Sequence, residues 1–146
     1  MKNENDKKKN SSQKPIYVDR DIPKSKAYLS LNGTSAKMLL VFLGKRQMLH
    51  LGRGKKKEWI CTNNGNIYFT YKEAKEKYNI SHPAFSRAIE ELVSKGFIDI
   101  ARQGIGIAKI ATLYSISDRW KKYGKKDFVE IKRQKQCSYR FNKYQK

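Results

Sequence analysis

The sequence predicts an α+β fold, with a three-helix core and a small antiparallel β-hairpin, flanked by basic tails. The main observation is a pattern of two helices joined by a tight turn at residues 70–96. Two short apolar strands around a glycine-containing turn follow at residues 97–116, and lysine-rich segments stand at both ends. The 146 residues suffice for one domain. We expect a disordered basic arm at 1–24, the domain at 25–123 and a basic, aromatic tail at 124–146.

The N-terminal arm has a composition typical of disorder. Residues 1 to about 22 are rich in Lys, Asn and Ser and have few apolar side chains. Such an arm either follows phosphates or a minor groove, or only keeps the protein soluble, and both interpretations are compatible with its composition.

The first helix of the core is predicted at residues 34–49. An Asn-Gly turn signal precedes Thr34 and Ser35, either of which can cap this helix. Residues 38–43, MLLVFL, are apolar on every side, so the helix must be covered all round. The domain core can cover one face. The opposite face of the helix must be covered by the segment at 28–31 or by the same helix of a second subunit. A homodimer is therefore one hypothesis. Sedimentation showing only monomer at micromolar concentration would exclude it.

Two short strands precede the helix pair. Residues 59–62 and 67–69 predict strands around an Asn-Gly turn, and we expect 67–69 to pair with the later hairpin and to lead into the helix at Tyr71. Trp59 is typical of a core or sheet-face position more than of a nucleobase platform. The basic loop before it, RGKKK at 53–57, is either a phosphate-contacting loop or a solvated connector.

The helix pair has clear start and stop signals. Thr70 and Glu73 form a capping box, in which each side chain can satisfy a free backbone donor. Ile80 is the apolar residue of the turn, Ser81 is a good N-cap, and Pro83 falls in the first turn of the second helix. The predicted buried stripe of that helix is Phe85, Ala88, Ile89, Leu92 and Val93, ended by Gly96. The opposite face carries short or polar side chains: His82, Ser86, Arg87 and Glu90.

The segment SHPAFSRAIEELVSKGFI at residues 81–98 resembles the recognition helix of bacterial winged helix-turn-helix proteins, which typically read Ser-x-x-Thr-Val-Ser-Arg-x-Leu-x-x-Leu-x-x-x-Gly-Leu-Ile. Ala84 stands in place of the usual threonine, and Phe85 in place of valine. The order of elements matches from about residue 31 to residue 117. The resemblance implies a DNA-binding domain of the kind found in transcription regulators and in plasmid- or phage-type replication initiators or replisome organisers.

In this resemblance the hairpin at 97–116 is the wing. Its glycines permit a tight reversal and a close approach of the backbone to a phosphate or groove wall. Arg102 and Lys109 flank the tip, within reach of the DNA backbone or minor groove. Ile105 and Ile107 either wedge into a minor groove or pack on a neighbouring element or subunit.

The C-terminal part begins with a short helix. Ser117 and Asp118 can cap it at 118–123, with Trp120 and Tyr123 closing over the core. The tail beyond it mixes basic and aromatic residues, a composition that suits single-stranded nucleic acid and a flexible duplex-binding tail equally well.

The charge favours a polyanionic partner. The chain has 33 basic and 13 acidic residues, a net charge of +20. Residues 59–100, which contain the helix pair, hold 5 of each, whereas 27–58 are net +6 and 118–146 net +8. Each basic side chain placed on a phosphate releases condensed counterions. The alternative is that the charge only maintains solubility.

The candidate base-reading residues lie in the first turns of the second helix, the form that enters a DNA major groove. Arg87 leads them because a guanidinium can bridge guanine O6 and N7. Alternatively, Arg87 pairs with Glu90 or Glu91 along its helix, or contacts only phosphate. His82 and Ser86 come next, although His82 can equally extend the cap and face water.

The candidate phosphate contacts are basic or capping residues around that helix. They are Ser81, Lys72, Lys75, Arg102, Lys109, Lys55, Lys56 and Lys57. For Lys72 and Lys75, a solvated helix face is the competing interpretation. The expected partner is double-stranded DNA.

Other chemistry is not indicated. The two histidines, His50 and His82, form no arrangement with an acid or thiol that predicts catalysis, and no cysteine stands at zinc-ligand spacing from them. We therefore expect no enzyme activity, metal, cofactor or small-molecule ligand. The sequence has no membrane span and no apolar signal core at its start, so we expect a cytoplasmic, nucleoid-associated protein. Cys61 and Cys137 would then stay reduced.

These observations predict a non-catalytic, sequence-specific double-stranded DNA-binding protein, either a transcription regulator or a plasmid- or phage-type replication initiation factor. The alternative is a protein-interaction scaffold that uses its apolar first helix and wing isoleucines, with non-specific nucleic-acid affinity from its tails.

Overall fold

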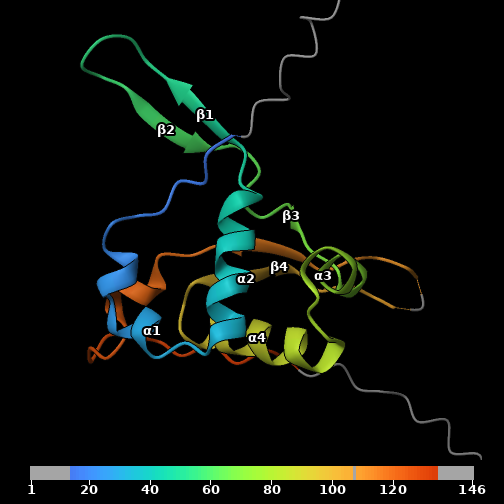
Figure 1. The fold of residues 1–146 in the computed structure, drawn as a ribbon. Helices are drawn as coiled ribbons and strands as arrows, with labels where there is room; N and C mark the ends of the chain where they lie inside the picture. The colour runs from blue at the N-terminus through green and yellow to red at the C-terminus, as the bar shows by residue number, and fades with distance from the viewer. Residues whose placement is uncertain (1–13, 107, 135–146) are drawn as a thin grey trace, which may run out of the picture.

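The computed structural model describes residues 14–106 and 108–134. Within them the fold is α+β, with four α-helices, two short 3-10 helices and two small antiparallel sheets (Figure 1). The elements in chain order are η2 (Ile22–Lys24), α1 (Lys26–Leu29), α2 (Gly33–Gly44), β1 (Met48–Leu51), β2 (Glu58–Cys61), β3 (Ile67–Tyr68), α3 (Tyr71–Tyr78), α4 (His82–Ser94), β4 (Ile98–Arg102), β5 (Leu113–Ile116) and η3 (Arg119–Lys122). None of the described helices is long and apolar enough to cross a membrane.

The main sheet has the strand order β3-β5-β4, all antiparallel. Ile67 lies opposite Tyr114, and Ile98 lies opposite Ile116, with a register shift in β4 between Ile100 and Arg102. The expected pairing of 67–69 with the later hairpin is therefore confirmed for β3.

The two strands predicted around the Asn-Gly turn are present as β2 and β3, but they do not pair with each other, because β2 pairs with β1. Two asparagines explain the difference. Asn63 Oδ1 accepts from the Gln47 N–H at 2.8 Å, which ties the chain to the end of α2. Asn64 Oδ1 accepts from the Ile116 N–H at 2.7 Å, which ties it to β5. The segment between the strands thus links two sheets and does not reverse one ribbon.

Helix α2 begins and ends earlier than expected. Its N-cap is Asn32, whose side chain accepts from the Ser35 N–H, and not Thr34 or Ser35. Ser35 is instead buried and donates its hydroxyl to Glu91. A cap two or three positions earlier is favoured because it leaves Ser35 free for that contact.

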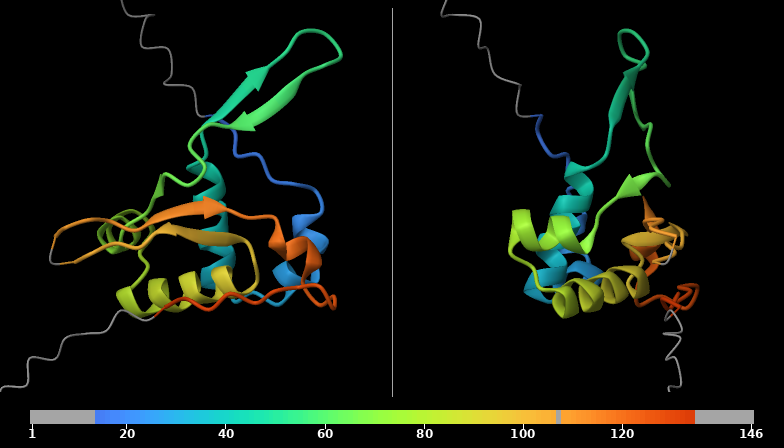
Figure 2. Two further views of the ribbon diagram at one scale, coloured as in Figure 1. Left: turned by 180° about the vertical axis from the view of Figure 1, so that it is seen from behind. Right: turned by 90° about the vertical axis from the view of Figure 1, so that its right-hand side faces the viewer.

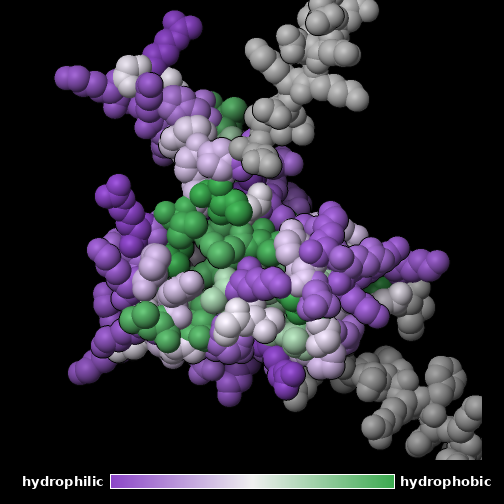
Figure 3. Space-filling view, in the orientation of Figure 1, coloured by the Kyte–Doolittle hydropathy of each residue, from purple (hydrophilic) through white to green (hydrophobic). Residues whose placement is uncertain are grey.

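The cover around α2 is also incomplete, contrary to the sequence expectation. Met38, Leu39, Phe42 and Leu43 are buried, but Leu40 stays 44% exposed. Figure 3 shows the corresponding hydrophobic patch over α2. A homodimer through this face stays a prediction.

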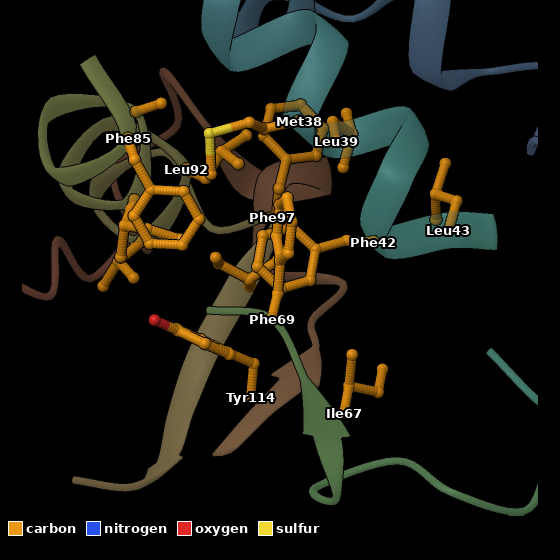
Figure 4. Close-up of a cluster of buried hydrophobic side chains, with 14 of the residues drawn as sticks. Met38, Leu39, Phe42, Leu43, Ile67, Phe69, Phe85, Leu92, Phe97 and Tyr114 are labelled. Atoms are coloured by element: carbon orange, nitrogen blue, oxygen red, sulfur yellow. The ribbon is translucent and has the colours of Figure 1, made fainter. Parts of the chain in front are cut away.

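The core lies between α2, α4 and the main sheet (Figure 4). Phe42 meets Phe69 and Tyr114 edge-on, with ring centroids 5.4 Å and 5.1 Å apart. Burial raises the pKa of Tyr114 to about 12, a consequence of core packing. Trp120 is buried and stacks on Phe97 at 5.8 Å, so its predicted position over the core is confirmed.

The boundaries of the folded part differ from the sequence expectation at both ends. Ile22 belongs to the core, whereas its sequence context predicts a disordered arm there. Residues 1–13 of that arm lie outside the described part. At the other end, residues 124–129 turn beside η3, and residues 130–133 lie beside α4 (Figures 1 and 2). The rest of the predicted tail, 135–146, lies outside the described residues. The short helix η3 begins at Arg119, with no side-chain cap from Asp118.

Candidate nucleic-acid interface

The turn between α3 and α4 is built by local hydrogen bonds. The Thr70 hydroxyl accepts from the Glu73 N–H at 3.2 Å and caps α3. Asn79 adopts a left-handed conformation (φ 52°) that ends α3, and the buried Ile80 donates its N–H to the Ala74 carbonyl. These contacts fix where α4 begins.

The capping box is only half formed. Glu73 does not return a hydrogen bond to Thr70, because its carboxylate binds Lys45 Nζ at 2.7 Å and lies 3.6 Å from Lys77 Nζ. The acidic side chain of α3 thus fastens this helix to the end of α2. That contact links the position of the helix pair to the rest of the core.

Helix α4 separates a buried face from a polar face, as its sequence pattern predicts. Ser81 is the N-cap and accepts from the Ala84 N–H at 3.4 Å. The whole predicted stripe is buried: Phe85, Ala88, Ile89, Leu92 and Val93. On the other face His82, Arg87 and Glu90 are exposed, whereas Ser86 is half-buried.

His82 is held by an aromatic neighbour. Its ring stacks on Tyr71 of α3, with centroids 3.7 Å apart and planes 19° from parallel. Tyr71 also contacts the buried Phe85 at 4.6 Å. The stack fixes the imidazole at the N-terminal end of α4, where a base-reading side chain would stand. The sequence offered no signal for this contact beyond the aromatic residue at the start of α3.

Arg87 is an exposed, unengaged cation. It makes no ion pair with the residues that the structure describes, and Glu91 contacts Lys95 and Ser35 instead. The alternative in which Arg87 pairs with Glu90 or Glu91 is therefore not seen. Its side chain lines a cavity whose other wall is formed by Glu130, Lys132 and Arg133.

Ser86 is covered by a contact that the sequence did not reveal. Arg133 Nη1 donates to Ser86 Oγ at 3.2 Å. The segment that carries Arg133 is fixed further back, where Arg119 Nη1 donates to the Val129 carbonyl at 3.2 Å. Arg119 also bonds Asp99 through Nε at 3.1 Å, so β4, η3 and the segment 124–134 are joined.

The β4–β5 hairpin adds basic groups beside α4. Arg102 is exposed at the end of β4, and Lys109 is exposed in the turn with φ 52°. Gly104 is required there because a Cβ would come within 2.6 Å of the Ile110 carbonyl oxygen. Ile105 is 54% exposed, and Ile107 lies outside the described residues.

Helix α3 carries two exposed lysines among the candidates. Lys72 lies 4.0 Å from Glu76, both largely exposed, and Lys75 is exposed without an ion pair to the described residues. In Figure 1, α3, the N-terminal end of α4 and the β4–β5 hairpin all lie toward the right of the molecule. The structure therefore places eight candidates on three neighbouring elements: Lys72 and Lys75 on α3, Ser81, His82, Ser86 and Arg87 at the N-terminal end of α4, and Arg102 and Lys109 on the β4–β5 hairpin.

The other three candidates lie elsewhere. Lys55, Lys56 and Lys57 are at the tip of the β1–β2 hairpin, which projects from the opposite end of the molecule to α4 (Figures 1 and 2). They do not share a surface with α4. Among the described residues there is no cluster of His, Cys, Asp and Glu that could hold a metal ion.

No protein family model, curated protein or solved structure shows a significant match to this chain. Function is therefore inferred from the arrangement of its own residues.

Proposed function

We propose that the chain is a non-catalytic, sequence-specific double-stranded DNA-binding protein with a winged helix-turn-helix domain. In this assignment α3 and α4 are the helix-turn-helix, and the β4–β5 hairpin is the wing. The three-helix core and the sheet order β3-β5-β4 agree with that architecture. Regulation of transcription and initiation of replication are the two roles that such binding would serve.

The observation that carries the proposal is the free guanidinium of Arg87 on the polar face of α4. This helix presents exposed polar side chains at its N-terminal half while the opposite stripe is fully buried. Such a helix can enter a major groove of about 12 Å width, where an arginine can bond guanine O6 and N7 together.

The basic groups around α4 support the same conclusion. Lys72 and Lys75 lie before the turn, and Arg102 and Lys109 lie on the wing. Cations on either side of a base-reading helix fix its register by contacting phosphates, without reading sequence themselves.

The test begins with selection of bound sequences from a random duplex library, followed by titration of the selected site. Arg87→Ala should weaken binding to that site by about 1–3 kcal/mol and relax the preference at one position. Arg20→Ala removes the same charge from an exposed position away from α4 and is the matched control. It should leave the preference unchanged.

Two results would argue against the proposal. One is a steep salt dependence with no enriched sequence, which would assign binding to the basic tails. The other is equal loss in the two variants, which would reduce Arg87 to a phosphate contact.

A protein-interaction scaffold is the second candidate, favoured by the hydrophobic patch over α2. Leu40 is 44% exposed there, and Leu29 of α1 is 71% exposed. If Leu40→Gln abolishes function in the cell while Arg87→Ala leaves DNA binding unchanged, the scaffold assignment replaces the first.

A further inference from the structure

The β1–β2 hairpin has two chemically different faces. Its register sets His50 opposite Trp59 and Leu49 opposite Ile60. Because successive residues of a strand point to opposite faces, the first pair lies on one face and the second on the other. One face is thus aromatic and the other aliphatic, and both lie outside the hydrophobic core.

The aromatic face carries a cluster of three rings, Tyr17, His50 and Trp59. Trp59 lies 5.3 Å from Tyr17 and 4.8 Å from His50, centroid to centroid. It is nevertheless 52% exposed, and Tyr17 is 48% exposed. Trp59 therefore holds a sheet-face position and not a core position, with part of its ring free to stack.

Positive charge lies on both sides of this aromatic cluster. The tip, residues 52–57, carries four exposed cations, has no acidic residue, and forms no ion pair with the rest of the described chain. A cavity of about 610 Å³ opens at the base of the hairpin, and its lining includes Lys14, Arg46, Tyr17 and Trp59. The four cations of the tip are Arg53, Lys55, Lys56 and Lys57.

We propose that the β1–β2 hairpin is a second nucleic-acid site, which binds single-stranded DNA. Bases stack on the aromatic cluster, and the tip and base of the hairpin hold the phosphates. Exposed rings beside cations suit an unpaired strand, because every free base offers a face for stacking whereas a duplex hides its faces. Figure 3 shows strongly hydrophilic side chains at the tip, so insertion of the tip into a lipid bilayer is disfavoured.

The site is independent of the proposed duplex interface. The hairpin and α4 lie at opposite ends of the molecule (Figures 1 and 2). The two sites share no residue. A protein built this way can hold a duplex at one end and an unpaired strand at the other.

The test uses the full chain and a thymidine oligomer of about 15 nucleotides. Trp120 is buried and Trp59 is half-exposed, so quenching of tryptophan fluorescence reports Trp59. Affinity is followed in parallel by anisotropy of a labelled oligomer. Trp59→Thr, which keeps a strand-forming residue, should weaken binding about ten-fold. Replacing Lys55, Lys56 and Lys57 together by Gln should lower the slope of log affinity against log salt by about 2.

Ile60→Thr is the matched control, because it changes the adjacent residue on the aliphatic face. It should leave the affinity for the oligomer unchanged, and so should Arg87→Ala at the other end of the molecule. Unchanged affinity in Trp59→Thr would overturn the proposal. An equal loss in Ile60→Thr would also overturn it and assign the hairpin to an apolar protein partner. Tighter binding of a uridine oligomer of the same length would overturn the assignment to DNA.

The outcomes for the two sites are distinguishable. If selection enriches no duplex sequence but Trp59→Thr weakens binding of the oligomer, only the duplex proposal is removed. If a selected duplex site depends on Arg87 but Trp59→Thr leaves the affinity for the oligomer unchanged, only the inference of a single-strand site is removed.

Discussion

Glu91 joins the N-terminal end of α2 to α4. Its carboxylate accepts from the Ser35 hydroxyl, from the Asn32 N–H at 3.3 Å and from Lys95 Nζ at 3.0 Å. Burial alone would raise the pKa of this carboxyl, but the hydrogen bonds from Ser35 and Lys95 outweigh it and hold the pKa below its usual value of 4.5. The ionised form therefore stabilises the fold.

Glu91→Gln is expected to lower the free energy of unfolding by about 2 kcal/mol at neutral pH, because an ionised acceptor is lost from three donors. Since the folded-state pKa is depressed, this contribution is complete above the unfolded pKa and disappears as the pH falls through the folded pKa. Urea titrations should therefore show the difference from wild type shrinking below the usual carboxyl pKa of 4.5. Glu90→Gln changes an exposed neighbour and should cost less than about 0.5 kcal/mol. A difference that stays constant into the acid range would contradict this account.

The β1–β2 hairpin is an element that the core does not need. No residue from 48 to 61 is buried, and its ends meet where the Thr62 N–H donates to the Gln47 carbonyl at 2.8 Å. Replacing residues 48–61 by an Asn-Gly turn should therefore keep the fold, with the free energy of unfolding within about 1 kcal/mol of wild type. Thermal and urea unfolding measure this. A large loss of stability would show that the hairpin supports α2.

Short-range rules predicted the elements that local sequence controls. The caps at Thr70 and Ser81, the turn at Ile80 and the buried stripe of α4 depend on contacts or spacings of at most six positions along the chain. The exposure of His82 and Arg87 follows from the same helical period. This much of the fold and of the candidate interface could be obtained from the sequence.

The rest depends on contacts between distant parts of the chain. Asn64 reaches Ile116, and Arg133 reaches Ser86, 47 positions away. Local propensity carries no information on such pairs. The sequence therefore does not show that β2 pairs with β1, nor that Arg133 covers Ser86. The sequence does not reveal the distance between the hairpin tip and α4 either. The hairpin follows the C-terminal end of α2, and this end points away from α4 (Figure 1).

At the scale of the whole molecule, the segment 124–134 both brings basic side chains to α4 and covers part of that helix. Its residues 130–133 lie along α4, where a cavity of about 470 Å³ is lined by Arg87 and Glu90 from one side and by Lys132 and Arg133 from the other. Within the proposed function this segment has two opposing effects. Its cations attract any duplex, while its contact with Ser86 occupies part of the base-reading face.

Truncation after Tyr123 separates these effects. It removes 8 basic and 2 acidic residues, so the net charge falls from +20 to +14. Affinity for random duplex and its salt dependence should both fall, because fewer counterions are released. The ratio of affinities for selected and random duplexes should rise, because the Ser86 hydroxyl becomes accessible. Anisotropy titrations with both duplexes across a salt series measure this. Full-length Arg133→Ala should raise the same ratio with only a small change in salt slope. A ratio that falls in both variants would show that Arg133 itself takes part in reading the site.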